Sequence, residues 1–414
     1  MFAWEVIRSL SRRAELTLLL AALAAVPAVA QAPQRLTLHD ALDRAARQNL
    51  DLAAARLRRA VSEAGVQIAG QRPNPTVTFS AARDLPHESL LFDQPLEIGG
   101  QRGRRMEVAR RELSLIDVEY SVLERRIRRN VREAYYGAAL ARGIAAYQQR
   151  LLGLAKRVQE IAQARFDAGD VPQLEVFQAN LGVTRAETDL EVSRQMEKVA
   201  LNQLNTLLNE AMAMDWELAT PMGEPPPPLT MEELVARAEQ TNPELQHLAQ
   251  EQRVEEARRL LLQAQRIPRV TVQAGSDFNS PPDFRAGPRG QLAVELPLFS
   301  RYQGELAQSR AASRLLESEA AATRRAVAGR SQNAFLNLSA RRRQVELYRE
   351  KLLPAGRQLA DLAEESYRSG KAGLLLVLEA QRNAQQVERE YLDSLFSLHS
   401  TFAELEETVG AALD

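Results

Sequence analysis

Two long runs of the chain repeat apolar residues at alternating spacings of three and four, the pattern of a helix with one packed face. They cover residues 103–168 and 304–369, and proline interrupts them only at Pro354. At 1.5 Å per residue, each run would form about 100 Å of helix, longer than a single globular core needs. The first run has the clearer coiled-coil seam, formed by Leu113, Ile116, Tyr120, Leu123, Ile127, Val131, Ala134 and Ala138.

Each run ends in the same way, with an aromatic residue followed three positions later by glycine. Phe166 precedes Gly169, and Tyr367 precedes Gly370 about 201 positions further on. Glycine ends helices by adopting the left-handed conformation, and apolar residues resume a helical pattern after it. The sequence therefore predicts two long helical hairpins, over residues 103–209 and 304–410, each with a glycine at its tip.

A pair of segments with strand character precedes each helical hairpin, within residues 75–98 and 269–298. The clearest segment places Leu292, Val294, Leu296 and Leu298 on one face and Gln291, Ala293 and Glu295 on the other. Such alternation fits strands that cross a membrane, and it also fits surface hairpins of a soluble domain. Because four strands cannot close a barrel, membrane insertion would require several chains to close the sheet together.

The whole pattern occurs twice, with landmarks about 193 positions apart. Thr37 and Thr230 are expected N-caps of opening helices, with a weak capping box to Asp40 and a complete one to Glu233. Asn49 and Asn242 are equivalent landmarks further on. We therefore expect a first repeat over residues 31–224, a stiff proline linker over 225–228 and a second repeat over 229–414.

The first 30 residues have the features of a secretory signal peptide. Three arginines precede an apolar stretch of about eleven residues, and Ala28-Val29-Ala30 suits cleavage after Ala30. The apolar stretch is shorter than the roughly 20 residues of a membrane-spanning helix. An exported protein is therefore expected, with an uncleaved membrane anchor as the alternative.

Composition excludes several classes of function. The formal charge is -1 and aromatic residues make up 5%, so neither a basic field nor a set of stacking platforms favours nucleic acid. The sequence contains no cysteine, which excludes disulfides and thiolate metal sites and leads us to expect no acyl anchor. The four histidines lack metal-ligand spacing, and no catalytic motif is present, so neither a cofactor nor an enzyme is expected.

Taken together, this layout resembles the outer membrane efflux protein (TolC) family. The residues that carry the resemblance are the duplicated openings at Leu36 and Leu229, the strand-to-helix corners and the tips. The corner at residues 94–102, with the sequence QPLEIGGQR, resembles the CzcC-like heavy-metal branch. Its counterpart at residues 296–304 carries the proline-leucine turn found across the family, and residues 377–381, VLEAQ, are typical of its tips.

The resemblance implies a mainly α fold with a small β part, assembled as a homotrimer. Three chains would close a 12-stranded β-barrel in the outer membrane of a Gram-negative bacterium, continued by a long α-helical barrel through the periplasm. The family serves as the passive exit duct of tripartite pumps. The implied partners are a periplasmic adaptor (membrane fusion protein), an inner-membrane transporter of the RND type, and outer membrane lipid.

The resemblance also indicates where function would lie at the tips. Acidic residues of the family line the periplasmic entrance, and the matching pore-aperture positions here are Glu175, Gln178, Leu376 and Glu379. Three copies would present up to six carboxylates, which favours cations. The glutamates fit solvated helix positions equally well, and Leu375 with Leu376 could instead form an apolar constriction.

The turns themselves are the expected docking surface for the adaptor, at Gly169, Asp170, Gly370 and Lys371. These residues also fit plain turns. The sequence thus favours an exit duct for heavy-metal cations. A drug or polypeptide export duct of the same fold and a periplasmic coiled-coil adaptor are the alternatives.

Overall fold

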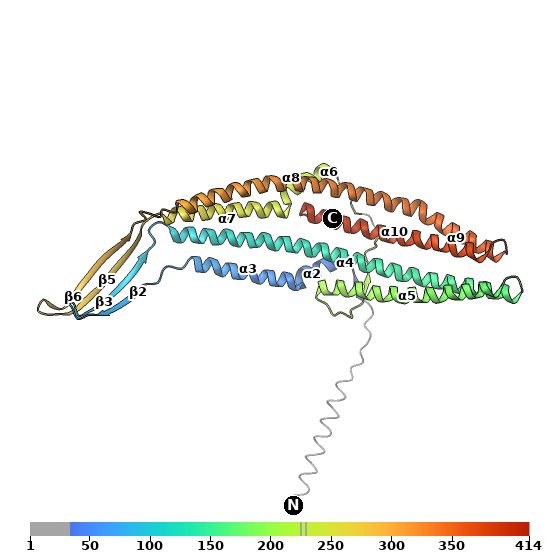
Figure 1. The fold of residues 1–414 in the computed structure, drawn as a ribbon, viewed down its shortest axis with the longest axis horizontal. Helices are drawn as coiled ribbons and strands as arrows, with labels where there is room; N and C mark the ends of the chain where they lie inside the picture. The colour runs from blue at the N-terminus through green and yellow to red at the C-terminus, as the bar shows by residue number, and fades with distance from the viewer. Residues whose placement is uncertain (1–33, 224–225, 228–229, 414) are drawn as a thin grey trace, which may run out of the picture.

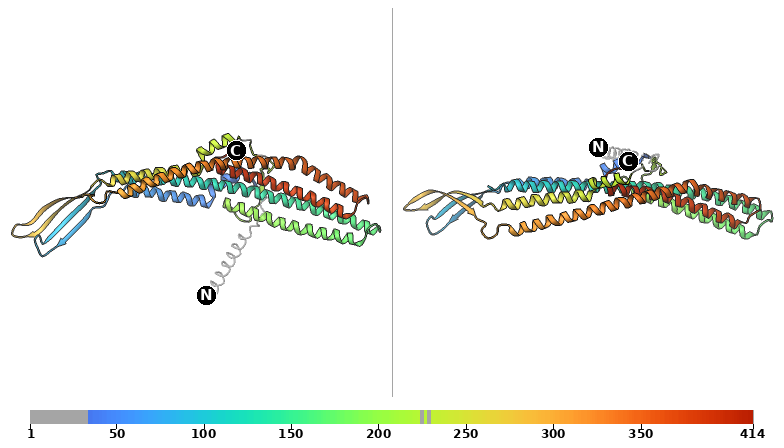
Figure 2. Two further views of the ribbon diagram at one scale, coloured as in Figure 1. Left: turned by 45° about the horizontal axis from the view of Figure 1, so that its top comes forward. Right: turned by 90° about the horizontal axis from the view of Figure 1, so that it is seen from above.

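The computed structural model describes residues 34–223, 226–227 and 230–413. The expected signal peptide at residues 1–30 lies outside the described residues, as do Leu229 and part of the proline linker. The fold is mainly helical with a small sheet at one end. Figure 1 shows the helices side by side along the long axis, with a four-stranded sheet at one end and two helical hairpin tips at the other. Figure 2 confirms this arrangement from two further directions.

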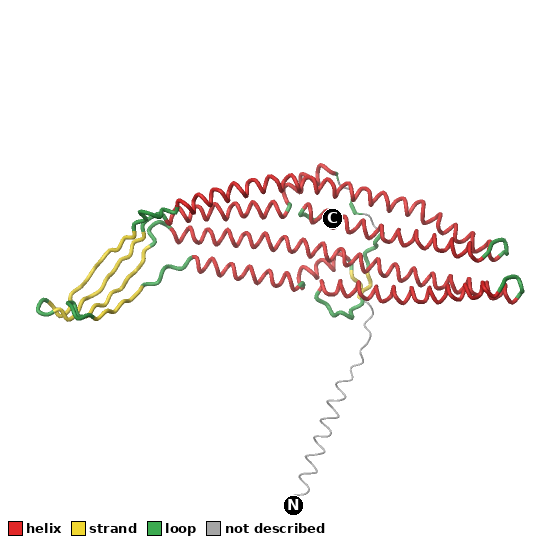
Figure 3. Tube along the Cα trace, viewed as in Figure 1, coloured by secondary structure: helices red, strands yellow, loops and turns green. Residues whose placement is uncertain are grey.

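The elements follow one another in the same order in both halves of the chain. The helices are α2 (Leu38–Gln48), α3 (Leu50–Ala69), α4 (Gln101–Asp167), α5 (Gln173–Leu208), α6 (Met231–Thr241), α7 (Pro243–Gln265), α8 (Gln303–Leu347), α9 (Leu353–Arg368) and α10 (Leu374–Val409). A π-helix, η1 (Tyr348–Leu352), joins α8 to α9. The strands are β1 (Gln34–Leu36), β2 (Thr76–Ala81), β3 (Glu88–Leu96), β4 (Trp216–Leu218), β5 (Arg269–Ser280) and β6 (Phe284–Glu295). Figure 3 shows the longer strands together at one end of the molecule and the short strands β1 and β4 at mid-length among the helices.

A four-stranded antiparallel sheet forms one end of the molecule, in the order β2-β3-β5-β6. Its register gives the two faces opposite characters. One row across all four strands holds Thr76, Asp93, Gln273 and Gln291, and the next row holds Val77, Phe92, Ala274 and Gly290. The predicted alternation is therefore confirmed within the strands, and the sheet has one apolar and one polar face.

One prediction about the sheet was wrong. Strand β6 ends at Glu295, so Leu296 and Leu298 lie in the loop after it. Because Pro297 has no N–H to donate, it cannot continue the hydrogen-bond ladder, although the apolar alternation carries on through it.

Helices α4 and α8 run beside different neighbours along their length. Near the sheet the contacts follow the order α3-α4-α7-α8, and near the tips they follow α5-α4-α10-α9. Among the described residues, no helix carries an apolar run long enough to cross a bilayer. The second long run also differs from its expected continuous helix, since η1 lies directly before Pro354, whose ring disrupts α-helical hydrogen bonding.

The N-caps of α2 and α6 differ from the prediction, because the complete capping box is at α2 and the partial one at α6. Thr37 and Asp40 form the complete capping box at α2, while at α6 only the Thr230 side chain accepts a bond, from the Glu233 N–H at 3.4 Å. Asn49 and Asn242 behave alike. Each caps the following helix through Oδ1, while Nδ2 donates to the end of a returning helix, at the carbonyls of Leu207 and Thr408.

The core lies at mid-length, where the short elements meet the long helices. One cluster gathers α2, α4 and α5 around the fully buried Trp216, and another gathers α6, α8 and α10. Strands β1 and β4 pair in parallel beside the first cluster. The Tyr135 hydroxyl donates to the Leu36 carbonyl at 3.0 Å and accepts from the Thr220 N–H at 2.9 Å, which fixes this pair to α4. The seam residues Ile127, Val131 and Ala138 are buried as predicted.

Candidate functional site at the hairpin tips

The two tips have the same backbone geometry. Gly169 and Gly370 adopt left-handed conformations, with φ of 80° and 73°. In each tip the residue after the glycine donates its N–H back into the helix, from Asp170 to the Arg165 carbonyl and from Lys371 to the Ser366 carbonyl, both at 2.9 Å. These bonds complete the helix C-caps, so the predicted glycine-terminated hairpins are confirmed.

Glu175 lies at the start of α5, and its carboxylate joins the two tips. The Tyr367 hydroxyl, on α9, donates to Glu175 Oε2 at 3.0 Å. Burial and then this bond raise the pKa of Tyr367 to about 12, because the carboxylate favours the protonated phenol. Glu175 is only half-buried, so one carboxylate oxygen is fixed by a partner in the same chain.

Arg165 completes this contact from α4. Its guanidinium lies 4.8 Å from the centre of the Tyr367 ring and donates to the Tyr367 carbonyl at 3.4 Å. The ring itself is fully buried in a small apolar cluster with Val158, Leu374 and Val377. Tyr367 is thus the residue through which the two hairpins are joined near their tips.

Sequence reasoning gave Tyr367 and Arg165 no functional role. The available signal was the pair of aromatic residues at equivalent positions, Phe166 and Tyr367. Only Tyr367 has a hydroxyl, and only α5 has a carboxylate at the facing position, because Leu376 replaces it in α10. That asymmetry explains why the hydroxyl-to-carboxylate bond forms from Tyr367 to Glu175 and has no counterpart from Phe166 to Leu376.

The other aperture positions lie apart from this bond. Gln178 is exposed and lines a groove of about 380 Å³ between α4, α5 and α10, together with Leu375 and Leu378. Leu376 is half exposed, and Glu379 is exposed on α10. The structure therefore joins Glu175 to Tyr367 and leaves Glu379 as the solvent-facing carboxylate of the set.

The docking candidates lie at the outermost turns. Gly169, Asp170, Gly370 and Lys371 are all exposed, and added Cβ atoms at the two glycines would meet open space. Nearby, Leu174 and Phe177 on α5 and Leu375 on α10 are also exposed. The tips therefore present apolar side chains around charged turns. Within the described part of the chain, no cluster of histidine and carboxylate side chains is arranged to hold a metal ion.

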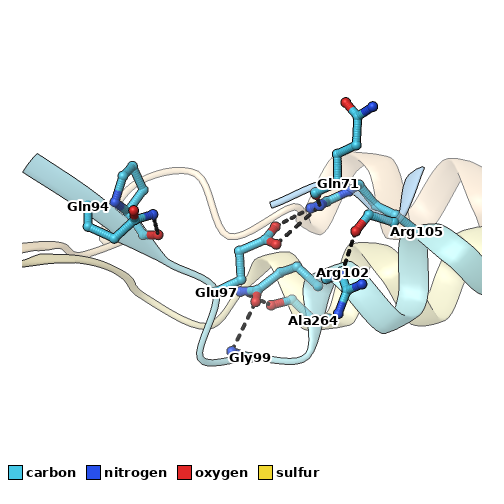
Figure 4. A network of polar contacts seen from close by, with 10 residues as sticks. Gln71, Gln94, Glu97, Gly99, Arg102, Arg105 and Ala264 are labelled. Atoms are coloured by element: carbon cyan, nitrogen blue, oxygen red, sulfur yellow. Dashed lines mark hydrogen bonds and ion pairs between the residues drawn. The ribbon is translucent and has the colours of Figure 1, made fainter. Parts of the chain in front are cut away.

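The strand-to-helix corner at residues 94–102 is held by polar contacts to the end of α3 and to α7. Glu97 forms an ion pair with Arg105, which also donates to the Gln71 carbonyl at 3.1 Å, as Figure 4 shows. Arg102 donates to the Gly70 carbonyl at 2.6 Å. These contacts fix the angle at which the first long helix leaves the sheet.

The two strand-to-helix corners, before α4 and before α8, contain the same local hydrogen bond. Gln101 and Gln303 each accept a bond from the backbone N–H two residues earlier, at 3.0 and 2.7 Å, and the residue between is left-handed in both corners. Gln101 also donates to the Ala264 carbonyl of α7 at 3.2 Å. An added Cβ at Gly99 would lie 2.8 Å from Ile267, so glycine is needed there for close packing.

Comparison with known proteins gives matches over nearly the whole described chain. A family model described as outer membrane efflux protein matches residues 41–210 and again residues 234–411. The cobalt-zinc-cadmium resistance protein CzcC of Cupriavidus metallidurans is 25% identical over 386 residues, covering 91% of this chain and 90% of that protein.

Two solved structures share the fold. CusC, a protein that forms a transmembrane channel, superposes with a TM-score of 0.74 at 14% identity, covering 91% of this chain and 92% of its own. The outer-membrane channel OprN has a TM-score of 0.73 at 16% identity, covering 91% and 90%. At these identities the structural comparisons establish the arrangement of the elements.

Proposed function

This chain belongs to the outer membrane efflux protein family, and from that premise we propose that it is the passive exit duct of a tripartite pump for heavy-metal cations. The protein is located in the outer membrane and its family consists of efflux channels. The observation that carries the proposal is the agreement between the family match in both halves and the likeness to CzcC over 91% of the chain. The duct itself carries out no chemical reaction.

The free edges of the sheet support assembly as a homotrimer. Strands β2 and β6 each pair on one side only, and an unpaired edge is not tolerated in lipid. Pairing β6 of each copy with β2 of the next would close three sheets into a 12-stranded barrel. The two halves of each chain would then act as tandem repeats that continue the barrel as a helical tunnel.

Apolar stripes on the outermost helices support the same assembly. On α3, exposed apolar side chains recur at spacings of one or two turns, at Leu50, Leu57, Val61 and Ile68. On the opposite edge, exposed leucines continue from α8 through η1 into α9, at Leu336, Leu352, Leu359 and Leu362. Helices that expose such stripes commonly bury them against a partner. Each copy would therefore cover the α3 edge of one neighbour with its own α8, and the α5 edge with its own α9.

We assign the aperture to Glu175, Gln178, Leu376 and Glu379. In a trimer the α5 and α10 tips would alternate around the periplasmic entrance, and carboxylates there attract cations and bind divalent ions weakly. The bond from Tyr367 restrains Glu175, so Glu379 is the carboxylate that remains free to meet a passing cation.

We assign adaptor docking to Gly169, Asp170, Gly370 and Lys371, with the adaptor linking the duct to an RND-type transporter in the inner membrane. The support is their position at the exposed turns, next to exposed apolar side chains. A bulky residue at Gly370 that left pump assembly intact would contradict this assignment.

A deletion strain tests the proposed substrate. Its growth is compared with that of the complemented strain on salts of zinc, cobalt, cadmium, nickel, copper and silver, and on hydrophobic drugs. Sensitivity confined to metals, and reversed by the intact gene, supports export of metal cations. Sensitivity confined to drugs would still support an exit duct, but it would show that the duct exports drugs and not metal cations. The family match disfavours a periplasmic adaptor.

A further inference from the structure

The apolar face of the sheet continues past the ends of its strands into the corner loops. Within the sheet, Val77, Phe79 and Leu292 are exposed on this face. Beyond the strand ends, Ile98 and Leu298 are exposed as well, and Phe299 has 94% of its surface accessible. An exposed apolar band of this extent marks a surface that another protein or a membrane covers.

Arginines follow this band immediately on the side of the helices. Five arginines are exposed here, at Arg72, Arg102, Arg104, Arg266 and Arg301. Two of the acids at this level already face other arginines, since Glu97 is paired with Arg105, and Glu295 lies 3.9 Å from Arg269. Glu305 lies further along α8 and is exposed. Within the described part of the chain, the side chains of Arg72, Arg104, Arg266 and Arg301 form no hydrogen bond or ion pair.

We propose that these corner arginines bind the phosphate groups of anionic phospholipids in the periplasmic leaflet of the outer membrane. The order of the layers, apolar and then cationic, matches the order of acyl chains and headgroups across half a bilayer. The helices leave the sheet on the arginine side (Figure 1), so this side faces the periplasm. The proposal rests on the proposed insertion of the sheet into the membrane.

Arginine suits this role better than lysine. Its planar guanidinium presents paired N–H donors to two phosphate oxygens and is less strongly hydrated than an ammonium group. Arg102 already donates through Nε to the Gly70 carbonyl, which holds its guanidinium against the corner. The corner therefore offers phosphate binding next to the apolar loops that would contact acyl chains.

Native mass spectrometry of the purified protein in defined nanodiscs tests the proposal. The discs contain phosphatidylcholine alone or phosphatidylcholine with phosphatidylglycerol, and retained lipids are counted on release. The wild-type protein should retain phosphatidylglycerol preferentially. The triple variant R104Q/R266Q/R301Q should lose this preference by about fivefold for each arginine removed. The matched control R314Q/R324Q/R325Q removes three exposed arginines of α8, away from the corner, and should retain it.

Three results would overturn the proposal. In the first case the wild-type protein retains both lipids equally. In the second case the control triple variant loses the preference as far as the corner variant does, which would indicate that bulk charge alone attracts the lipid. In the third case the corner variant dissociates into single chains, which would indicate that a second copy covers the corner. A protein that does not insert into nanodiscs would contradict the proposed function instead, and this outcome is seen before any lipid is counted.

Discussion

Tyr367 is the side chain whose removal should affect the tips most specifically. Its hydroxyl, on α9, donates the hydrogen bond to the carboxylate of Glu175, and its ring is fully buried. A hydrogen bond to a charged group contributes about 1.5–3 kcal/mol when buried, and we take about 1 kcal/mol here because Glu175 is half-exposed. We expect Tyr367→Phe to raise the rate of trypsin cleavage at the tip about fivefold, measured by the appearance of fragments ending at Arg165 or Lys371.

Tyr348 provides the control for this experiment. Its hydroxyl donates to Glu390 at 3.0 Å, the same length of bond, but between η1 and α10 and away from the turns. Tyr348→Phe should leave cleavage at the tips unchanged. If Tyr367→Phe also left it unchanged, the bond to Glu175 would not restrain the tips.

His399 is a buried histidine at mid-length that the sequence gave no reason to single out. Its ring stacks on Tyr136 at 3.7 Å between centroids, and Nε2 donates to the Met222 carbonyl at 2.8 Å. Burial lowers the pKa of His399 from 6.5 to about 4, and the charge of Arg132 acts in the same direction. The folded protein therefore keeps His399 neutral at a pH where an unfolded chain would protonate it.

The pH dependence of stability follows from this difference. Between pH 6.5 and about pH 4 the unfolded state binds a proton that the native state does not, so stability falls as the pH falls. The slope from this group is at most about 1.4 kcal/mol per pH unit. We expect the urea midpoint of wild type to fall more steeply over this range than that of His399→Gln, whose amide can still donate to Met222. Parallel slopes would show that His399 titrates normally.

Among the elements, the turns of the hairpins offer a comparison between two glycines three residues apart. Gly370 has a φ of 73° and Gly373 a φ of -84°, and an added Cβ meets open space at both. Alanine at 370 should therefore destabilise the turn by about 1–2 kcal/mol through backbone strain alone, while alanine at 373 should be nearly neutral. The tip-cleavage rate again reports the difference, and equal rates would show that the turn relaxes without cost.

Local chemistry made several of these elements predictable from sequence. Glycines mark the tips, Asn49 and Asn242 mark paired helix boundaries, and alternation marks the strands, because each depends on neighbours along the chain. The errors in the sequence-based predictions also arise because these patterns report only on neighbours along the chain. The pattern could not distinguish strand β6 from the extended loop after it, and it could not rank a short Asp40 side chain above Glu233 as a capping partner.

The contacts of the candidate site depended on packing that no local pattern encodes. Tyr367 and Glu175 are 192 positions apart and meet only because α9 and α5 lie in adjacent hairpins. The corner contacts likewise join α4 to the ends of α3 and α7. The sequence identified the aperture positions by resemblance, but it could not indicate that one of the two glutamates is held by a tyrosine.

At the scale of the whole assembly, the exposed Glu379 should influence which ions pass. Three copies would place three such carboxylates around the entrance, where they favour cations. We expect Glu379→Ala to lower the cation-to-anion permeability ratio roughly twofold to threefold in planar bilayers, measured from reversal potentials in a salt gradient. Gln178 occupies the equivalent position of the other half and is neutral, so Gln178→Ala should leave the ratio unchanged. Unchanged reversal potentials in Glu379→Ala would remove this residue from the aperture.

Assembly itself should depend on the stripe of α3. Leu57 and Val61 are 70% and 72% exposed in the single chain and lie one helical turn apart. If a neighbour covers them, a carboxylate at each position would have to lose its hydration in three interfaces at once. We expect L57D/V61D to weaken each interface by at least about 1.4 kcal/mol, which lowers the association constant of each interface about tenfold. The fraction of trimer is measured from heat-modifiable bands on gel electrophoresis and by size-exclusion chromatography in detergent.

A matched control separates this interface from general effects of added charge. Met212 is 55% exposed, but it lies in the loop after α5, away from the stripe. Met212→Asp should therefore leave the trimer intact. A stable trimer in L57D/V61D would mean that the edge of α3 faces solvent or lipid. The ring would then have to close through the sheet alone, because β2 and β6 would remain the unpaired edges available to a neighbour.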